Sequence, residues 1–303
     1  NELKNDLQKY FSSAVQSKNI SNVAAVIVPH AGYVFSAEVA ASGFNQVDPE
    51  KEYENIFVLA ISHRVAFYGA SVFTRGDYIT PLGKVKVNIE LGEKLIEEND
   101  LFSSRTDAHL YEHSLEVQLP FLQFKLKKDF KIVPIVLGSN SPEVCEKIAE
   151  VLKPYFNSRN LFVISTDFSH YPEYKNAVEV DKVTAEAVLS NSPDKLIETI
   201  KNYENKNIPE LATCMCGEAA VLTLLYMTKN NSAIKTELIQ YKNSGDSQYG
   251  EKNKVVGYNA IVFSLVERKN MSKSKNEFQL NDNEKKELLA IERSTVKEYV
   301  TNH

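Results

Sequence analysis

The sequence predicts a layered α/β protein in which a central mixed, largely parallel sheet is covered by helices on both faces. Short apolar runs recur along the chain with helix-like stretches between them, which is typical of α/β folds. Four of these runs are almost continuously hydrophobic, as expected of strands that are buried on both faces. A repeat of about 20 to 50 residues is not visible, so the pattern does not indicate a repeat protein.

The apolar runs and the stretches between them define the expected elements. The strands are predicted at 22–29, 55–62, 131–138, 160–166, 234–241 and 255–266. The helices are predicted at 36–46, 88–98, 141–155, 176–190, 193–203 and 214–229.

The composition changes beyond a main domain that we place at 1–266. Residues 267–279 are polar, charged and without periodicity, which predicts a linker. Residues 280–303 are predicted to form a helix, because Asn281 stands three residues before Glu284 in a variant of the capping box. A single helix cannot bury its own apolar stripe, which here consists of Leu288, Leu289, Val296, Tyr299 and Val300.

Composition excludes several classes of protein. The formal net charge is −5, so there is no electrostatic reason to expect nucleic-acid binding. No run of about 18 apolar residues occurs, so no membrane span is expected. Cys145, Cys214 and Cys216 form neither a disulfide framework nor a paired zinc motif, which predicts reduced thiols and a cytoplasmic protein. The chain begins at Asn1, so a removed leader remains an open alternative.

Histidines gather where strands are predicted to end. Ligands of open α/β sheets bind beyond the carboxyl ends of the strands, so loops from distant parts of the chain can converge there. For any one of these histidines, the alternative is a surface or capping residue. His30, His63 and His170 each follow a predicted strand, His109 and His113 lie in the segment DAHLYEHSLE, and His303 ends the chain.

The stretch VPHAGYVFS places His30 on a short loop. Pro29 restricts Val28 to extended geometry, and Gly32 is expected to permit a turn that a side chain would obstruct. An imidazole held in this way suits a metal, a proton transfer or an anionic substrate.

The stretch TCMCG adds a possible thiol ligand. Thr213 is predicted to cap a helix, and cysteines in its first turn would have their thiolate form favoured by the amide dipoles. Cys214 and Cys216 would point in different directions on a helix, so one site would use one of them. The alternative for each is a small buried apolar residue.

Two further segments carry polar groups. In STDFSH, Asp167 could orient a histidine ligand or cap a turn, and His170 could act as an acid or base. In LYEHSLEVQLPFLQ, Glu112 and His113 precede an apolar stretch, and Glu116 is expected to face water. The sequence contains no GxGxxG, Walker A, GxSxG or HExxH motif, which counts against nucleotide binding, serine hydrolysis and zincin chemistry.

Taken in order, these motifs resemble those of the Memo family, the AmmeMemoRadiSam system protein B group. The segments are VPHAGYVFS, AISHR, DAHLYEHSLEVQLPFL, IVPIVLG, STDFSHY, and CG with a later YNAIVFS, and together they cover about residues 23–266. The resemblance implies a fold related to the class III extradiol dioxygenases of the LigB type. Residues 280–303 resemble the first helix of an Ammecr-type domain, which implies a fragment of a longer fusion protein.

The resemblance also implies a metal site. His30, His63 and Cys216 match its metal positions, which predicts Fe(II) or Cu as the cofactor, with Zn possible in a purified sample. By the same resemblance, the polar residues expected to carry the catalytic steps in this pocket are His113, His170 and Asp167.

Two departures from the family pattern are informative. Glu218 follows Cys216-Gly217, where relatives often have arginine, which weakens an inference of anion recognition. A thiol also stands where ring-cleaving dioxygenases complete their iron site with a carboxylate, so ring cleavage is not carried over.

Two functions therefore remain open from the sequence. The first is a metal-dependent, dioxygenase-like oxidoreductase acting on a small molecule or a peptide, beside a radical-SAM partner that the family name implies. The second is a non-catalytic binding module that holds a phosphorylated or carboxylated ligand in the same cleft. Histidine would bind such an anion more strongly below about pH 6.5.

Overall fold

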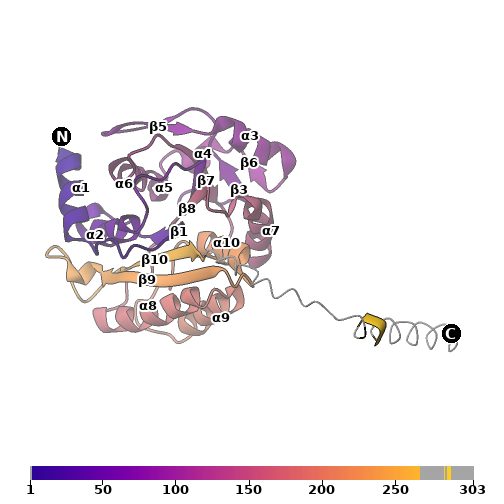
Figure 1. Cartoon of the computed structure of the whole chain (residues 1–303). Coiled ribbons are helices and arrows are strands. Elements are labelled where there is room, and N and C mark those ends of the chain that lie inside the picture. Colours follow the sequence, from indigo (N-terminus) through magenta and orange to yellow (C-terminus); the bar gives the residue numbers. More distant parts are fainter. Residues whose placement is uncertain (1, 267–282, 284, 288–303) are drawn as a thin grey trace. The chain divides into compact units, whose positions relative to one another are not determined.

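The computed structural model describes residues 2–266, Asn283 and residues 285–287. The chain divides into a unit of residues 1–266 and a unit of residues 267–303. The first unit is an α/β fold built around one sheet (Figure 1).

The described part of the sheet contains ten strands. They are β1 (Val23–Val28), β2 (Asn55–Ile61), β3 (Ala70–Val72), β4 (Tyr78–Thr80), β5 (Gly83–Val87), β6 (Phe102–Ser103), β7 (Lys131–Leu137), β8 (Asn160–Ser165), β9 (Ile234–Asn243) and β10 (Gly257–Leu265). Their order is β4-β5-β7-β2-β8-β1-β10-β9, with β3 paired to β7 and to β6. The run from β5 to β1 is parallel, and β10 and β9 are antiparallel, so the predicted mixed, largely parallel sheet is confirmed.

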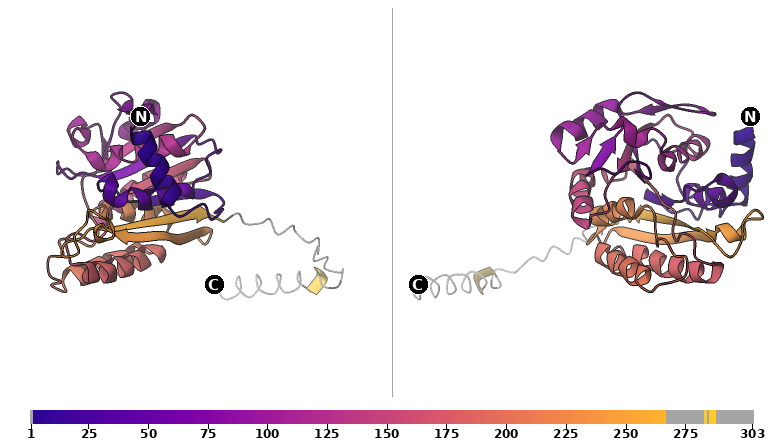
Figure 2. Two further views of the ribbon diagram at one scale, coloured as in Figure 1. Left: turned by 90° about the vertical axis from the view of Figure 1, so that its left-hand side faces the viewer. Right: turned by 180° about the vertical axis from the view of Figure 1, so that it is seen from behind.

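Helices cover both faces of the sheet (Figure 2). One face is packed by α1 (Glu2–Ser13), α2 (Tyr33–Asn45), α5 (His113–Glu116) and α6 (Leu119–Lys125). The other face is packed by α3 (Ile89–Glu98), α7 (Pro142–Leu152), α8 (Tyr174–Leu189), α9 (Pro193–Glu204) and α10 (Glu218–Thr228). Successive residues of a strand enter opposite cores: Ile27 faces the second set of helices, and Val26 and Val28 face the first.

The segment between β2 and β7 contains the helix predicted at 88–98, which is α3, and several short elements that the sequence did not predict. Here the short strands β3 to β6 alternate with α3, with α4 (Thr106–His109), and with α5 and α6. Except for α3, these elements are two to seven residues long, which is too short for a hydrophobic period to be recognised. The amino-terminal helix α1 was also not predicted.

Several helix boundaries differ from the prediction by a few residues; α2, for example, begins at Tyr33 and not at residue 36. The helix expected at 214–229 begins at Glu218, so both cysteines precede it. Thr213 does not cap this helix, because its Oγ1 accepts a hydrogen bond from the amide of Met215 in a local turn. The helix expected at 141–155 ends at Leu152 and continues as the 3₁₀ turn Lys153–Tyr155.

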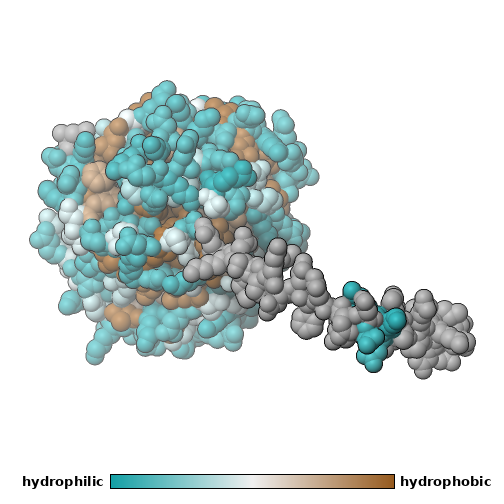
Figure 3. Space-filling model, in the orientation of Figure 1, coloured by the Kyte–Doolittle hydropathy of each residue, from teal (hydrophilic) through white to brown (hydrophobic). Residues whose placement is uncertain are grey.

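The predicted linker, 267–279, lies outside the described residues. Of the predicted helix 280–303, only Asn283 and residues 285–287 are described, and they are helical. The Ammecr-type assignment therefore stays a prediction. No helix in the described residues is both long and apolar enough to cross a membrane. The face of the molecule drawn in Figure 3 is mainly hydrophilic and is interrupted by hydrophobic patches.

Candidate metal centre

Three neighbouring parallel strands end at the same edge of the sheet, and each is followed by residues of the predicted site. His30 lies two residues after β1, and His63 lies two residues after β2. Asp167 and His170 follow β8, which runs between β1 and β2. The parallel order therefore brings together loops that are far apart in the sequence.

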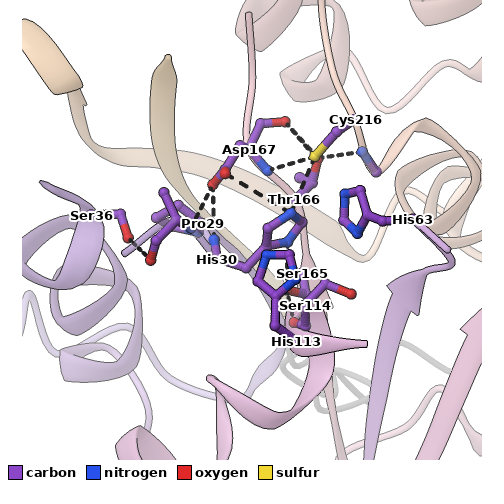
Figure 4. Close-up of polar contacts among 12 residues, drawn as sticks. Pro29, His30, Ser36, His63, His113, Ser114, Ser165, Thr166, Asp167 and Cys216 are labelled. Atoms are coloured by element: carbon purple, nitrogen blue, oxygen red, sulfur yellow. Dashed lines mark hydrogen bonds and ion pairs between the residues drawn. The ribbon is translucent and has the colours of Figure 1, made fainter. Parts of the chain in front are cut away.

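His30, His63 and Cys216 meet in one place (Figure 4). One ligand atom from each lies within 4.8 Å of the other two. The Cys216 Sγ atom is 3.3 Å from His30 Nε2, and the rings of His30 and His63 are 5.2 Å apart between centroids. His30 is 3% exposed, whereas the side chain of His63 is 28% exposed. The cluster is thus buried on one side and open to solvent on the other.

These separations fit a transition-metal ion. Metal–nitrogen bonds of about 2.0 Å and metal–sulfur bonds of about 2.3 Å at tetrahedral angles place donor atoms about 3.3 to 3.5 Å apart. The Cys216 Sγ–His30 Nε2 distance of 3.3 Å already falls near this range, and the other donor pairs, which lie within 4.8 Å, would need to approach by at most about 1.5 Å. Two further groups of possible ligands share a residue with this one. One consists of Asp167, His170 and Cys216, and the other of His63, Glu112 and His113.

His30 is held from behind by Ser165. Its Nδ1 atom is 3.0 Å from Ser165 Oγ, at the end of β8. Burial first, then the neighbouring His63 and His113, lower the pKa of His30 to about 3. The imidazole is therefore neutral at pH 7, the form in which histidine binds metals.

Glu112 holds His63, and sequence reasoning missed this role. The His63 amide donates to Glu112 Oε2 at 2.6 Å, and the His63 ring Nδ1 is 3.0 Å from Oε1. Burial alone would raise the pKa of Glu112, but hydrogen bonds from His63 and Ser114 lower it to about 2. An ionised carboxylate only accepts hydrogen bonds, so His63 Nδ1 donates and its Nε2 is free to bind a metal.

Asp167 connects two of the site's loops. Its Oδ1 accepts the amides of His30 at 2.8 Å and Ala31 at 3.3 Å. Its own amide donates to Cys216 Sγ at 3.3 Å, and its carbonyl accepts the Cys216 amide at 3.2 Å. Burial raises the pKa of Asp167, although the hydrogen bond from the His30 amide opposes that shift. These contacts allow Asp167 to orient the loops of His30 and Cys216, and its catalytic role stays a prediction.

Cys216 is positioned by close packing and not by a helix. A Cβ atom on Gly217 would lie 2.5 Å from Thr166 Cβ, so only glycine allows this approach. The prediction that helix dipoles favour the thiolate is wrong, because burial and Asp167 raise the pKa of Cys216. Metal binding would have to displace that proton. Cys214 is fully buried outside these groups, and burial raises its pKa to about 12.

The other predicted histidines take different places. His113 is 51% exposed at its side chain and stacks on His63 with ring centroids 5.3 Å apart. The backbone of His170 pairs with Thr213 and Val256, and its buried Nε2 has no hydrogen-bond partner among the described residues. His109 is outside these groups, with its Nε2 3.1 Å from Ser71 Oγ.

The expected need for a glycine after His30 is not supported. Gly32 has a φ of −52°, which any residue adopts. A Cβ there would meet only Phe35, at 3.8 Å. Glycine at position 32 is therefore not required by the turn that carries His30.

Comparisons with known proteins agree with the sequence motifs. A protein from Ignicoccus hospitalis described as a MEMO1 family protein is 34% identical over 242 residues, 79% of this chain and 82% of its own. A MEMO1 family protein from Methanobrevibacter smithii is 35% identical over 241 residues, 78% of this chain and 82% of its own. The crystal structure of an uncharacterized protein from Escherichia coli K12 has a TM-score of 0.51 at 13% identity, covering 79% of this chain and 99% of that one, which supports the fold alone.

The family assignment covers almost all of the first unit. Residues 1–262 match the family described as Memo-like protein. Together with relatives above 30% identity over most of their length, this shows that the chain belongs to the Memo-like protein family.

Proposed function

We propose that the protein is a metal-dependent, dioxygenase-like oxidoreductase in which His30, His63 and Cys216 hold Fe(II) or Cu. The observation that carries the proposal is the approach of these three ligand atoms to within 4.8 Å from three distant loops. The donor set of two imidazoles and one thiol suits iron, copper or zinc, and not magnesium or calcium. Zinc would fill the same donors in a sample purified without control of the metal.

The side chains around the centre are suited to different tasks. Bound iron or copper would supply one-electron redox chemistry and an open position for oxygen or substrate. A small-molecule or peptide substrate would approach from the side of His63 and His113, because these are the exposed members of the group. His113 can move a proton between the substrate and water, since its ring reaches solvent.

His170 and Asp167 act on the buried side. One ring nitrogen of His170 lies within 4.8 Å of ligand atoms of Asp167 and Cys216, and the buried Nε2 has no hydrogen-bond partner among the described residues, so His170 can hold a proton or add a further donor there. Asp167 keeps the loops of His30 and Cys216 together through four hydrogen bonds. These contacts support the roles proposed for the two residues.

The alternative function, a module for a phosphorylated or carboxylated ligand, has less support. His30 is neutral at pH 7, and the ionised Glu112 lies beside His63 and His113. Glu218 follows Gly217 where relatives often have arginine, so this position supplies no cation for an anionic ligand. A site with this charge does not attract an anion.

The cellular setting of the proposal rests on the family resemblance and on the cysteines. The proposed radical-SAM partner and fused Ammecr-type domain come from that resemblance, whereas the proposed cytoplasmic location comes from the three cysteines, which form no disulfide framework in the sequence. Co-purification of the full-length protein with a radical-SAM enzyme from its own cells would test the partnership.

Metal analysis tests the assignment of the donors. After anaerobic purification, we expect about one iron or copper per chain in the wild type and little in a His30→Ala, His63→Ala double variant. Cobalt(II) should give a sulfur-to-metal charge-transfer band that a Cys216→Ser variant lacks. His109→Ala is the matched control and should keep the wild-type metal content. Equal metal in the wild type and the double variant would refute the site.

A further inference from the structure

Two buried polar residues, Gln118 and Ser165, lie next to His30. Ser165 is the last residue of β8, and Gln118 immediately precedes α6. The Ser165 Oγ atom is 3.0 Å from His30 Nδ1, and Gln118 Nε2 is 2.9 Å from Ser165 Oγ. Both side chains are completely buried, so water does not compete for these contacts.

The orientation of the Gln118 amide follows from its neighbours. Its Nε2 atom is 2.9 Å from the carbonyl oxygen of Pro29, as well as 2.9 Å from Ser165 Oγ. A carbonyl oxygen can only accept a hydrogen bond, so the opposite amide orientation would bring two acceptors together. The two hydrogens of Gln118 Nε2 are therefore donated to Pro29 and to Ser165.

The hydroxyl of Ser165 then has one possible arrangement. It has one hydrogen to donate, and the carbonyl oxygen of Ser114, 2.5 Å away, can only accept it. The lone pairs of Ser165 Oγ accept from Gln118 and face His30 Nδ1. His30 Nδ1 must therefore carry the ring proton, and its Nε2, 3.3 Å from Cys216 Sγ, has a free lone pair.

We infer that Gln118 and Ser165 are positioning residues that fix the neutral His30 ring in its Nδ1–H tautomer, so that Nε2 is a ready metal donor. The direction of the relay is set by two backbone carbonyls, those of Pro29 and Ser114, which cannot reverse it. Gln118 Oε1 is buried without a hydrogen-bond partner in the described part of the chain. Such an unsatisfied acceptor carries a cost, which favours a role for this side chain beyond stability.

The tautomer can be read in the metal-free protein. Nitrogen-15 NMR of the histidine rings separates a protonated ring nitrogen from one with a free lone pair. We expect His30 in the wild type to show a protonated Nδ1 and a bare Nε2. Ser165→Ala removes the acceptor, so it should give a mixture of the two tautomers. Gln118→Met keeps the Ser114 carbonyl but leaves the Ser165 hydroxyl freer to turn its hydrogen toward His30 Nδ1, so it should give a smaller share of the second tautomer.

Matched controls separate this effect from the loss of a buried polar group. Ser42 is as buried as Ser165 and also bonds a backbone carbonyl, an amide and a glutamine. Gln46 is buried and donates to two carbonyls, those of Gln16 and Ser42. Ser42→Ala and Gln46→Met should leave the His30 ring signals unchanged. A wild type protonated at Nε2, or wild-type signals in both Ser165→Ala and Gln118→Met, would overturn the inference.

The effect on metal binding rests on the proposed function. Loss of a residue that orients a metal ligand lowers metal affinity by about 10- to 100-fold, so we expect Ser165→Ala to bind cobalt(II) that much more weakly than Ser42→Ala. If the wild type binds no cobalt(II), the proposed function fails and the ring signals still decide the tautomer. If the wild type binds it and Ser165→Ala equals Ser42→Ala, the positioning role is overturned. Should Ser165→Ala not fold, Gln118→Met against Gln46→Met carries the same comparison.

Discussion

Replacement of Gly217 by alanine should separate Cys216 from the other metal donors. The new Cβ atom would lie 2.5 Å from Thr166 Cβ, 2.6 Å from Thr166 Oγ1 and 2.8 Å from the Ser165 carbonyl. Ordinary carbon–carbon contact is at about 3.5 Å, so the two loops must move apart by about 1 Å. The φ of Gly217 is −90°, so the conflict is with neighbouring atoms and not with the backbone conformation.

The cost of this overpacking is about 1 to 3 kcal/mol, which corresponds to a fall in Tm of roughly 3 to 10 °C for a domain of this size. A shift of about 1 Å is large against a metal–sulfur bond of about 2.3 Å, so cobalt(II) affinity should fall at least about tenfold. Gly32→Ala is the control, since its Cβ would meet only Phe35 at 3.8 Å. Thermal unfolding and cobalt(II) titration of both variants measure the two effects. A Gly217→Ala protein with the Tm and cobalt affinity of Gly32→Ala would refute the reasoning.

Three further results are expected. Glu112→Gln should weaken cobalt(II) binding about tenfold, and Glu112→Ala should weaken it more, because glutamine can still accept a hydrogen bond from His63 Nδ1. Equal cobalt(II) affinities of the two variants in a titration would contradict this. Burial raises the pKa of Asp181 to about 7, so the folded state holds a proton that the unfolded state loses above about pH 4. The free energy of unfolding of the wild type, measured relative to that of Asp181→Asn, should therefore fall between about pH 4 and 7, by at most about 1.4 kcal/mol per pH unit. Urea unfolding in which the difference between the two proteins stays the same across this pH range would exclude this. His113→Ala should keep its metal content but lose turnover, and metal analysis and rate measurements check the two effects. Loss of the metal in this variant would instead make His113 a ligand.

The sequence predicted the site residues that follow strands. His30, His63 and His170 were found because near-continuous apolar runs mark buried strands, and parallel strands end at one edge of a sheet. The main helices and strands were predicted to within a few residues for the same reason. The grouping of His30 and His63 with Cys216 came from the family resemblance, because spacing alone does not show which loops meet.

The residues that hold the ligands were not predictable from spacing. Glu112 binds a histidine 49 positions earlier, and Ser165 is contacted by an amide 47 positions earlier. Only the folded chain brings such pairs together. One feature of the sequence pointed to Glu112 as a site residue: it directly precedes His113, in a loop that carries a candidate site histidine. The start of α10 was predicted too early because Thr213 followed by an apolar stretch resembles a capped helix. In the structure the helix begins only at Glu218, after the residue Gly217, which packs tightly against Thr166.

Anomalous X-ray scattering at the iron and copper edges, from crystals of anaerobically purified protein, tests the central claim most directly. The account predicts one peak at bonding distance from His30 Nε2, a ring nitrogen of His63 and Cys216 Sγ. A peak elsewhere in the chain would contradict it. In protein without zinc at these donors, the absence of a peak at both edges would contradict it as well.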